Sequence, residues 1–174
     1  MIYFVSEAFI KQTTPVGENV DANDIMPSIY TAAMGYVRPI IGTVFFDDLL
    51  TKFNNQTLNP DEVDLVQNWL KPAIAWRACQ QISISATFQL KNKGLQTQSG
   101  DYSQSPEYRA AMFVSHEYGD RAAMFENLLL KHLEDKTVAA LYPVFLQNDN
   151  KQALARRKNC EDHPYVFQSS IHII

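Results

Sequence analysis

Residues 26–50 read MPSIYTAAMGYVRPIIGTVFFDDLL, and this stretch decides the architecture that the sequence predicts. Apolar residues at helical spacing predict a first helix at residues 24–37. The proline and glycine of residues 39–43 predict its end, and a second helix is expected at residues 44–53, with Thr43 as its cap. The stretch contains no group suited to chemistry, which indicates a module for packing and assembly.

The composition is that of an ordinary folded domain. The 174 residues are 46% hydrophobic and 20% charged, with a net charge of −4 and a pI near 5.5. Phosphate binding needs clustered Lys and Arg, and residues 156–158 form the one basic run. Residues 1–7 lack the basic segment of a signal peptide, and no run of about 18 apolar residues occurs. We therefore expect one domain with an appended arm, which neither reads nucleic acid nor enters a membrane.

Residues 1–146 are expected to form a mainly α-helical domain, a bundle of about four to six helices with a projecting β-like ribbon. Alternation of apolar and polar residues from residue 82 predicts the ribbon, within residues 82–104. Residues 147–174 lose clear periodicity and are expected to form an extended C-terminal arm. The other expected elements are a strand or extended lead-in at 3–14, a helix opened by residues 60–62 and kinked at Pro72, a helix at 105–133 and a short helix at 137–145.

The titratable side chains form no catalytic or metal-binding pattern. The four histidines, at positions 116, 132, 163 and 172, include no pair at the i, i+4 spacing of a metal site. Cys79 is expected to be a small buried apolar group, and Cys160 has acids and a histidine only as sequence neighbours, which seldom form a nucleophile and its base. We expect no enzyme, no metal, no cofactor and a reducing compartment. The acids expected to complement helix dipoles are Asp47, Asp48, Asp61, Glu62 and Asp64.

Arg38 and Arg77 each stand alone as a charge in an apolar helical stretch. Such a side chain can lay its stem along apolar surface and keep its charge in water. It can also anchor a contact between subunits, because Arg is enriched at the centres of interfaces. The sequence leaves both interpretations open. The large apolar residues Met112, Met124 and Phe125 are expected to lie in the core.

Segments rich in β-forming residues are the other candidates for contact with partners, because an unpaired strand edge invites association. One is the ribbon and the other is the end of the arm. The candidate contact residues are Phe88, Leu90, Lys91 and Lys93 in the ribbon, and Tyr165, Phe167, Ile171, Ile173 and Ile174 in the arm.

Three blocks of sequence resemble, in their order and spacing, small neck proteins of Bacteroidetes tailed phages, including crAss-like phages. The blocks are MPSI to VRPIIGTVFFDDLL within residues 26–50, WLKPAIAW at 69–76 and LKNKGL at 90–95. The neck proteins in question are head-tail connectors, also called adaptor or head completion proteins. The blocks are structural, so the resemblance implies a function for the chain as a whole and assigns no catalytic role.

The resemblance implies a structural virion protein of the phage neck that assembles in the host cytoplasm. Its subunit would repeat about twelve times in a ring around the axis of the portal. The implied partners are further copies of the chain, the portal protein and the adjacent neck or tail ring protein, with DNA only as passing cargo. The alternative is a monomeric helical regulator or inhibitor that binds a host protein through its exposed arm.

Overall fold

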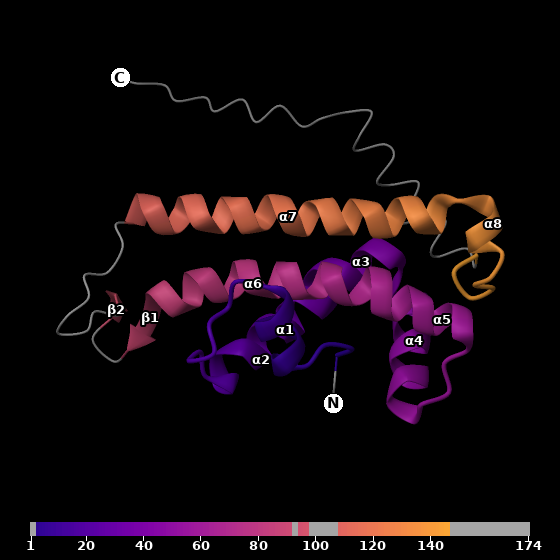
Figure 1. The fold of residues 1–174 in the computed structure, drawn as a ribbon, viewed down its shortest axis with the longest axis horizontal. Coiled ribbons are helices and arrows are strands. Elements are labelled where there is room, and N and C mark those ends of the chain that lie inside the picture. Colours follow the sequence, from indigo (N-terminus) through magenta and orange to yellow (C-terminus); the bar gives the residue numbers. More distant parts are fainter. Residues whose placement is uncertain (1–2, 92–93, 98–107, 147–174) are drawn as a thin grey trace, which may run out of the picture.

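The computed structural model describes residues 3–91, 94–97 and 108–146. The described part is mainly α-helical, which confirms the expected fold class (Figure 1). Two long helices each contain a π-helical segment, written η, in which the turns are wider than in an α-helix. The elements are α1 Glu7–Thr13, α2 Ala22–Thr31, η1 Ala32–Val37, α3 Arg38–Ile41, α4 Thr43–Asn55, α5 Pro60–Asp64, η2 Leu65–Leu70, α6 Lys71–Thr87, β1 Phe88–Lys91, β2 Gly94–Thr97, α7 Tyr108–Glu134 and α8 Lys136–Ala139.

The first long helix, α2–η1–α3, continues through Pro39. Asp21 caps its start by accepting a hydrogen bond from the N–H of Asn23. In η1 the N–H of Arg38 bonds to the carbonyl of Ala33, five residues earlier. This wider turn gives the proline ring the space that the carbonyl four residues earlier would occupy in an α-helix. The predicted break at Pro39 is therefore wrong.

The second long helix, α5–η2–α6, accommodates Pro72 in the same way. The N–H of Lys71 bonds to the carbonyl of Val66, again five residues earlier. The helix continues past this proline, as the sequence predicted. In both long helices the π-helical segment ends directly before a basic residue that is followed by proline.

Gly42 forms the corner between α3 and α4. Its φ of 91° and ψ of 138° lie in a region that residues with a Cβ rarely adopt. The carbonyl of Gly42 accepts a hydrogen bond from the N–H of Phe46 at 3.0 Å, so Gly42 is the cap of α4. Thr43 is the first residue within α4, so the expectation that it caps this helix is wrong.

Replacing Gly42 by Ala is expected to lower the free energy of unfolding by about 1–3 kcal/mol, because an added Cβ strains this backbone conformation. Gly35→Ala is the matched control, since its Cβ would come no closer than 4.0 Å to a Thr31 methyl carbon. That variant is expected to be neutral or to gain about 0.4–1 kcal/mol. Urea denaturation followed by circular dichroism measures both, and equal losses would contradict the prediction.

The N-terminal segment contains a helix, α1, where a strand or extended lead-in was predicted. Ser6 begins α1 by accepting a hydrogen bond from the N–H of Phe9 at 3.3 Å. Ile10 of this helix is fully buried. The prediction fails at Glu7–Thr13 because a good cap and a buried apolar face outweigh the β-forming residues nearby.

Helix α6 extends to Thr87, into the stretch predicted to be ribbon. Ile82 is buried as part of the helix face that also buries Cys79, so the alternating sequence here is helical and the prediction of a strand from residue 82 is wrong. The hairpin itself is confirmed, because β1 and β2 pair antiparallel with Leu90 opposite Leu95. Its turn, residues 92–93, lies outside the described residues.

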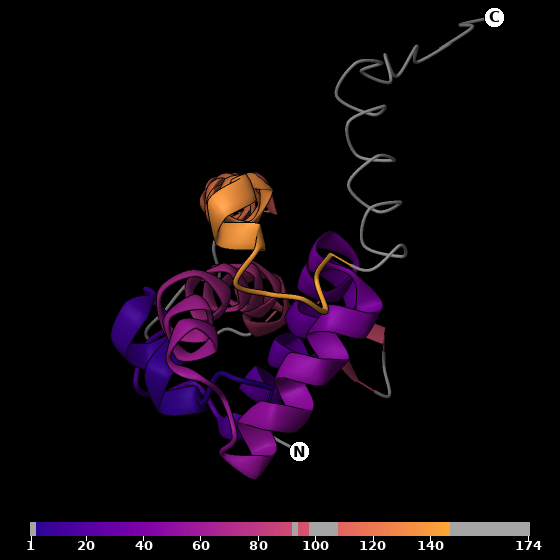
Figure 2. The ribbon, with the colours of Figure 1, turned by 90° about the vertical axis from the view of Figure 1, so that its right-hand side faces the viewer.

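Helix α7, with 27 residues, lies along α6 (Figures 1 and 2). The spacing of residues at alternating steps of three and four predicted that Ser115, Ala122 and Leu129 share one face of this helix, and all three are buried. The expected start of this helix at residues 105–107 lies outside the described residues. Helix α7 therefore forms one side of the molecule.

The chain after α7 is less helical than predicted. Helix α8 ends at Ala139, and turns replace the rest of the helix expected at residues 137–145. Tyr142 and Phe145 pack against Phe45 of α4, with ring centroids 5.7 and 5.4 Å apart. The predicted arm, residues 147–174, lies outside the described residues.

Candidate interaction surfaces

Arg77 joins α6 to α7. Its Nε and Nη2 atoms donate to the two carboxylate oxygens of Glu126, each at 2.7 Å. Nη1 donates to the Gln80 side chain at 2.7 Å, and the guanidinium lies 4.5 Å from the ring centre of Tyr36. The side chains of Arg77 and Glu126 are only 12% and 9% exposed. Arg77 is therefore bonded within the chain, and a role as an anchor between subunits stays a prediction.

Arg38 joins α3 to α4 across the Gly42 corner. Its Nε and Nη2 atoms donate to the carboxylate of Asp47 at 2.9 and 2.6 Å. The hydrogen bonds that Arg38 donates to the carboxylate of Asp47 raise the pKa of Arg38. Arg38 is half-buried, so it remains accessible as a contact candidate. Asp47 lies beyond the first turn of α4, and the prediction that it complements the helix dipole is wrong.

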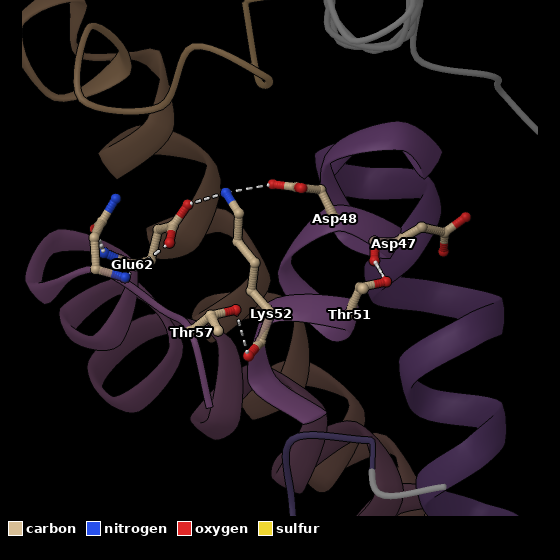
Figure 3. Close-up of polar contacts among 7 residues, drawn as sticks. Asp47, Asp48, Thr51, Lys52, Thr57 and Glu62 are labelled. Carbon is tan, nitrogen blue, oxygen red and sulfur yellow. Dashed lines mark hydrogen bonds and ion pairs between the residues drawn. The ribbon is translucent and has the colours of Figure 1, made fainter. Parts of the chain in front are cut away.

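Lys52 of α4 holds two carboxylates, as Figure 3 shows. Its Nζ lies 2.8 Å from the carboxylate of Asp48 and 2.6 Å from that of Glu62. The hydrogen bonds that Lys52 donates to Asp48 and, with a smaller effect, to Glu62 raise the pKa of Lys52. Glu62 also forms a capping box with Asn59 at the start of α5. Glu62 lies in the first turn of α5, as expected. Its buried carboxylate also links α5 to α4 through Lys52.

Of the other acids expected in the first turn of a helix, one lies there and two do not. Asp61 lies in the first turn of α5, where the sequence placed it. Asp48 lies beyond the first turn of α4, and Asp64 is the last residue of α5. Their expected roles as complements to a helix N-terminus are therefore wrong.

The described residues contain no group of three or more His, Cys, Asp or Glu side chains placed to hold a metal ion. Cys79 is buried, as predicted, and burial raises the pKa of its thiol to about 11. A thiol with that pKa is almost entirely protonated at neutral pH and is a poor nucleophile. Cys160 lies outside the described residues.

A small hollow beside Cys79 was not predicted. It encloses about 200 Å³ between the loop at residues 15–20, α6 and α7, and mostly apolar side chains line it. Ile82 and Tyr118 contribute from the two helices. Three segments far apart in the sequence form the hollow, so no local pattern could have indicated it.

The ribbon and arm candidates are only partly described. Phe88, Leu90 and Lys91 lie in β1, whose only described partner strand is β2. Lys93 lies outside the described residues, as do all the candidates of the arm: Tyr165, Phe167, Ile171, Ile173 and Ile174.

The face of α7 directed away from α6 carries exposed apolar side chains. Phe113 is 66% exposed, Met124 49% and Leu128 41%. The prediction that Met124 lies in the core is wrong. Other residues of α7, among them Ala122 and Leu129, form the face that packs on α6, and Met124 lies outside that face. Met112 and Phe125 are half-buried.

His132 of α7 stacks on Trp69 of η2, with ring centroids 4.2 Å apart and planes 12° apart. Burial lowers the pKa of His132, although the carboxylates of Asp64 and Asp135 act in the opposite direction. In this structure its contact is within the chain.

The lowered pKa of His132 predicts a stability that falls in acid. The unfolded chain binds the proton near pH 6.5, whereas the folded chain binds it only at lower pH, so stability is complete above about pH 6.5 and declines below it. Urea midpoints at pH 7.5 and pH 5.5 should differ less for His132→Phe than for the wild type. His116→Phe, at an exposed position, is the control. An unchanged pH dependence in His132→Phe would contradict the prediction.

None of the described helices combines the length and the apolar character that a membrane span requires. No curated protein and no solved structure matches the chain. Residues 37–153 match DUF6712, described as a family of unknown function. The matched range begins at the end of η1 and includes the elements from α3 to α8. Because the match covers more than half of the sequence, the chain belongs to the DUF6712 family.

Proposed function

We propose that the chain is a structural subunit of a tailed-phage neck, a ring-forming connector that binds below the portal and joins the DNA-filled head to the tail. The observation that carries this proposal is the resemblance of three sequence blocks to connector proteins of Bacteroidetes phages. The first block spans α2 to α4, the second lies across η2 and α6, and the third is the ribbon.

The chemistry of these blocks supports a role in assembly. Arg77 is bonded to a buried carboxylate inside the chain, whereas Arg38 is bonded to Asp47 and stays partly exposed. The described residues include no group of three or more His, Cys, Asp or Glu side chains placed to hold a metal ion. A protein of this kind acts by contact, and a contact between two different patches, repeated by rotation, closes into a ring.

We propose that the ribbon and residues 147–174 are the segments that contact neighbouring subunits and the portal. In the described part of the chain β1 and β2 form a two-stranded sheet, and each strand keeps one edge without a partner strand. A two-stranded ribbon is marginally stable alone, so a further strand from a partner would stabilise it. The β-forming residues 165–174 of a neighbour, or a strand of the portal, would suit this edge.

Electron microscopy of purified necks, with this chain tagged, tests the proposal directly. A symmetric ring of tagged subunits against the portal is expected. Mixing the full chain with the portal of the same phage and measuring the mass of the complex is the second test. A complex of one copy with one host protein, and no ring with portal, would instead favour the regulator. Removing residues 147–174 is expected to weaken portal binding, and unchanged binding would contradict the role of the arm.

Arg38→Glu tests whether this residue contacts a neighbour. The Arg38–Asp47 pair is partly exposed and contributes about 0–1 kcal/mol, so the variant should fold. Weakened ring assembly with a normal circular dichroism spectrum is expected. Unchanged assembly would restrict Arg38 to its contact with Asp47.

A further inference from the structure

The outer face of α7, defined here by Asp120, Ala123, Met124, Asn127, Leu128 and Lys131, lines a shallow hollow of about 400 Å³. Helix α7 lies at the edge of the molecule (Figure 2). The residues of this face are exposed, except for the half-buried Ala123. Met124 and Leu128 expose large apolar surface there. A face of this composition suits a protein partner.

The residues of this face are arranged symmetrically along the helix. Asp120 and Lys131 are 11 positions apart, which is about three helical turns, so both point to the same side. The midpoint between them falls between residues 125 and 126. Met124 and Asn127 share this midpoint, as do Ala123 and Leu128.

This symmetry makes the face complementary to itself in one orientation. In an antiparallel pairing about the midpoint, Asp120 of each helix would lie opposite Lys131 of the other. The small Ala123 would lie opposite the larger Leu128. A parallel pairing would instead oppose Asp120 to Asp120 and Lys131 to Lys131, which like-charge repulsion disfavours. Neither Asp120 nor Lys131 forms an ion pair with another residue in the described ranges.

We propose that two copies of this chain associate through the outer faces of α7, antiparallel about a two-fold axis near residues 125 and 126. Asp120 of each copy contacts Lys131 of the partner subunit. The apolar side chains Met124 and Leu128 supply most of the affinity, and the charges set the direction, because exposed ion pairs contribute little by themselves.

Two pairs of like charges limit the affinity of this dimer. The same alignment brings Glu117 opposite Glu134 at each end, and these like charges weaken the association. The dimer is therefore a reversible one. It uses one patch twice, unlike the two different patches of a ring, and it does not depend on the proposed neck function.

Sedimentation of the full chain over a concentration series tests this pairing through two charge reversals. Asp120→Lys leaves two positive charges in each contact, and Lys131→Asp leaves two negative charges. Each variant alone is expected to dimerise at least roughly tenfold more weakly than the wild type. In an equimolar mixture of the two variants, one contact of the heterodimer joins the two substituted side chains, whose charges are opposite. The other contact joins the unchanged Asp120 and Lys131, so the mixture should regain wild-type affinity.

Circular dichroism shows that each variant is folded. Met124→Glu should also weaken the dimer at least tenfold, whereas Val63→Glu, at a similarly exposed apolar position on α5, should leave it unchanged. A wild-type chain that stays monomeric up to about 200 µM would overturn the proposal. So would a mixture that associates no more tightly than either variant alone.

Discussion

Arg77→Met is expected to lower the free energy of unfolding by about 3–5 kcal/mol, because it leaves the buried carboxylate of Glu126 without its cation. The guanidinium fills three roles at once. It pairs with Glu126 on α7, bonds Gln80 on its own helix and lies against the ring of Tyr36. Methionine keeps much of the volume of the side chain but supplies none of the donors.

The double variant Arg77→Met/Glu126→Leu separates the buried charge from the lost contact. Removing both charges is expected to restore most of the stability, since an apolar pair of similar volume is often as stable as a buried ion pair. Urea denaturation of the two single variants and the double variant measures this as a double-mutant cycle. A double variant as unstable as the sum of the single variants would contradict the prediction.

Phe45→Ala is expected to cost about 3–5 kcal/mol, through lost burial and the cavity that remains. Phe45 is 1% exposed and packs against both Tyr142 and Phe145. It therefore supports the turns after α8 as well as α4. Val44→Ala, at the exposed neighbouring position, is the control and should change stability by less than about 0.5 kcal/mol.

Hydrogen exchange distinguishes this packing role from a general loss of stability. In Phe45→Ala the amide of Phe145, which bonds to the carbonyl of Tyr142 at 3.0 Å, should lose protection first. The amides of α6 should follow only with global unfolding. Uniform loss of protection across both regions would show that Phe45 does not specifically hold the turns after α8.

Regular apolar spacing allowed the long helices to be predicted. It placed the buried side of α7 correctly at Ser115, Ala122 and Leu129, because the residues with which one helix packs on another recur every three or four positions. The spacing of apolar residues could not distinguish a helix from a strand where the same residues fit both periods. The stretch around Ile82 alternates between apolar and polar residues, yet it is helical. It continues α6, and Ile82 extends the face of α6 that buries Cys79.

The polar contacts could not be read from the sequence. Glu126 lies 49 residues from Arg77, and no local pattern links them. Arg38 and Asp47 are nine positions apart, yet their pairing depends on the turn at Gly42, which brings α3 against α4. Sequence reasoning singled out both arginines but did not predict Asp47 and Glu126 as their partners, since tertiary packing sets the partners.

The two π-helical segments also bear on how the chain can change in length. Relative to an α-helix, a π-helical turn holds one extra residue, and each helical residue turns the chain by about 100°. A single deletion within Ala32–Val37 would relieve that turn and rotate the chain from Arg38 onward by about 100° relative to α2. A deletion within Leu65–Leu70 would rotate α6 relative to α5 in the same way and move Arg77 away from Tyr36 of η1. Relatives of this chain should therefore keep the number of residues in these two segments, and insertions should collect in the loops.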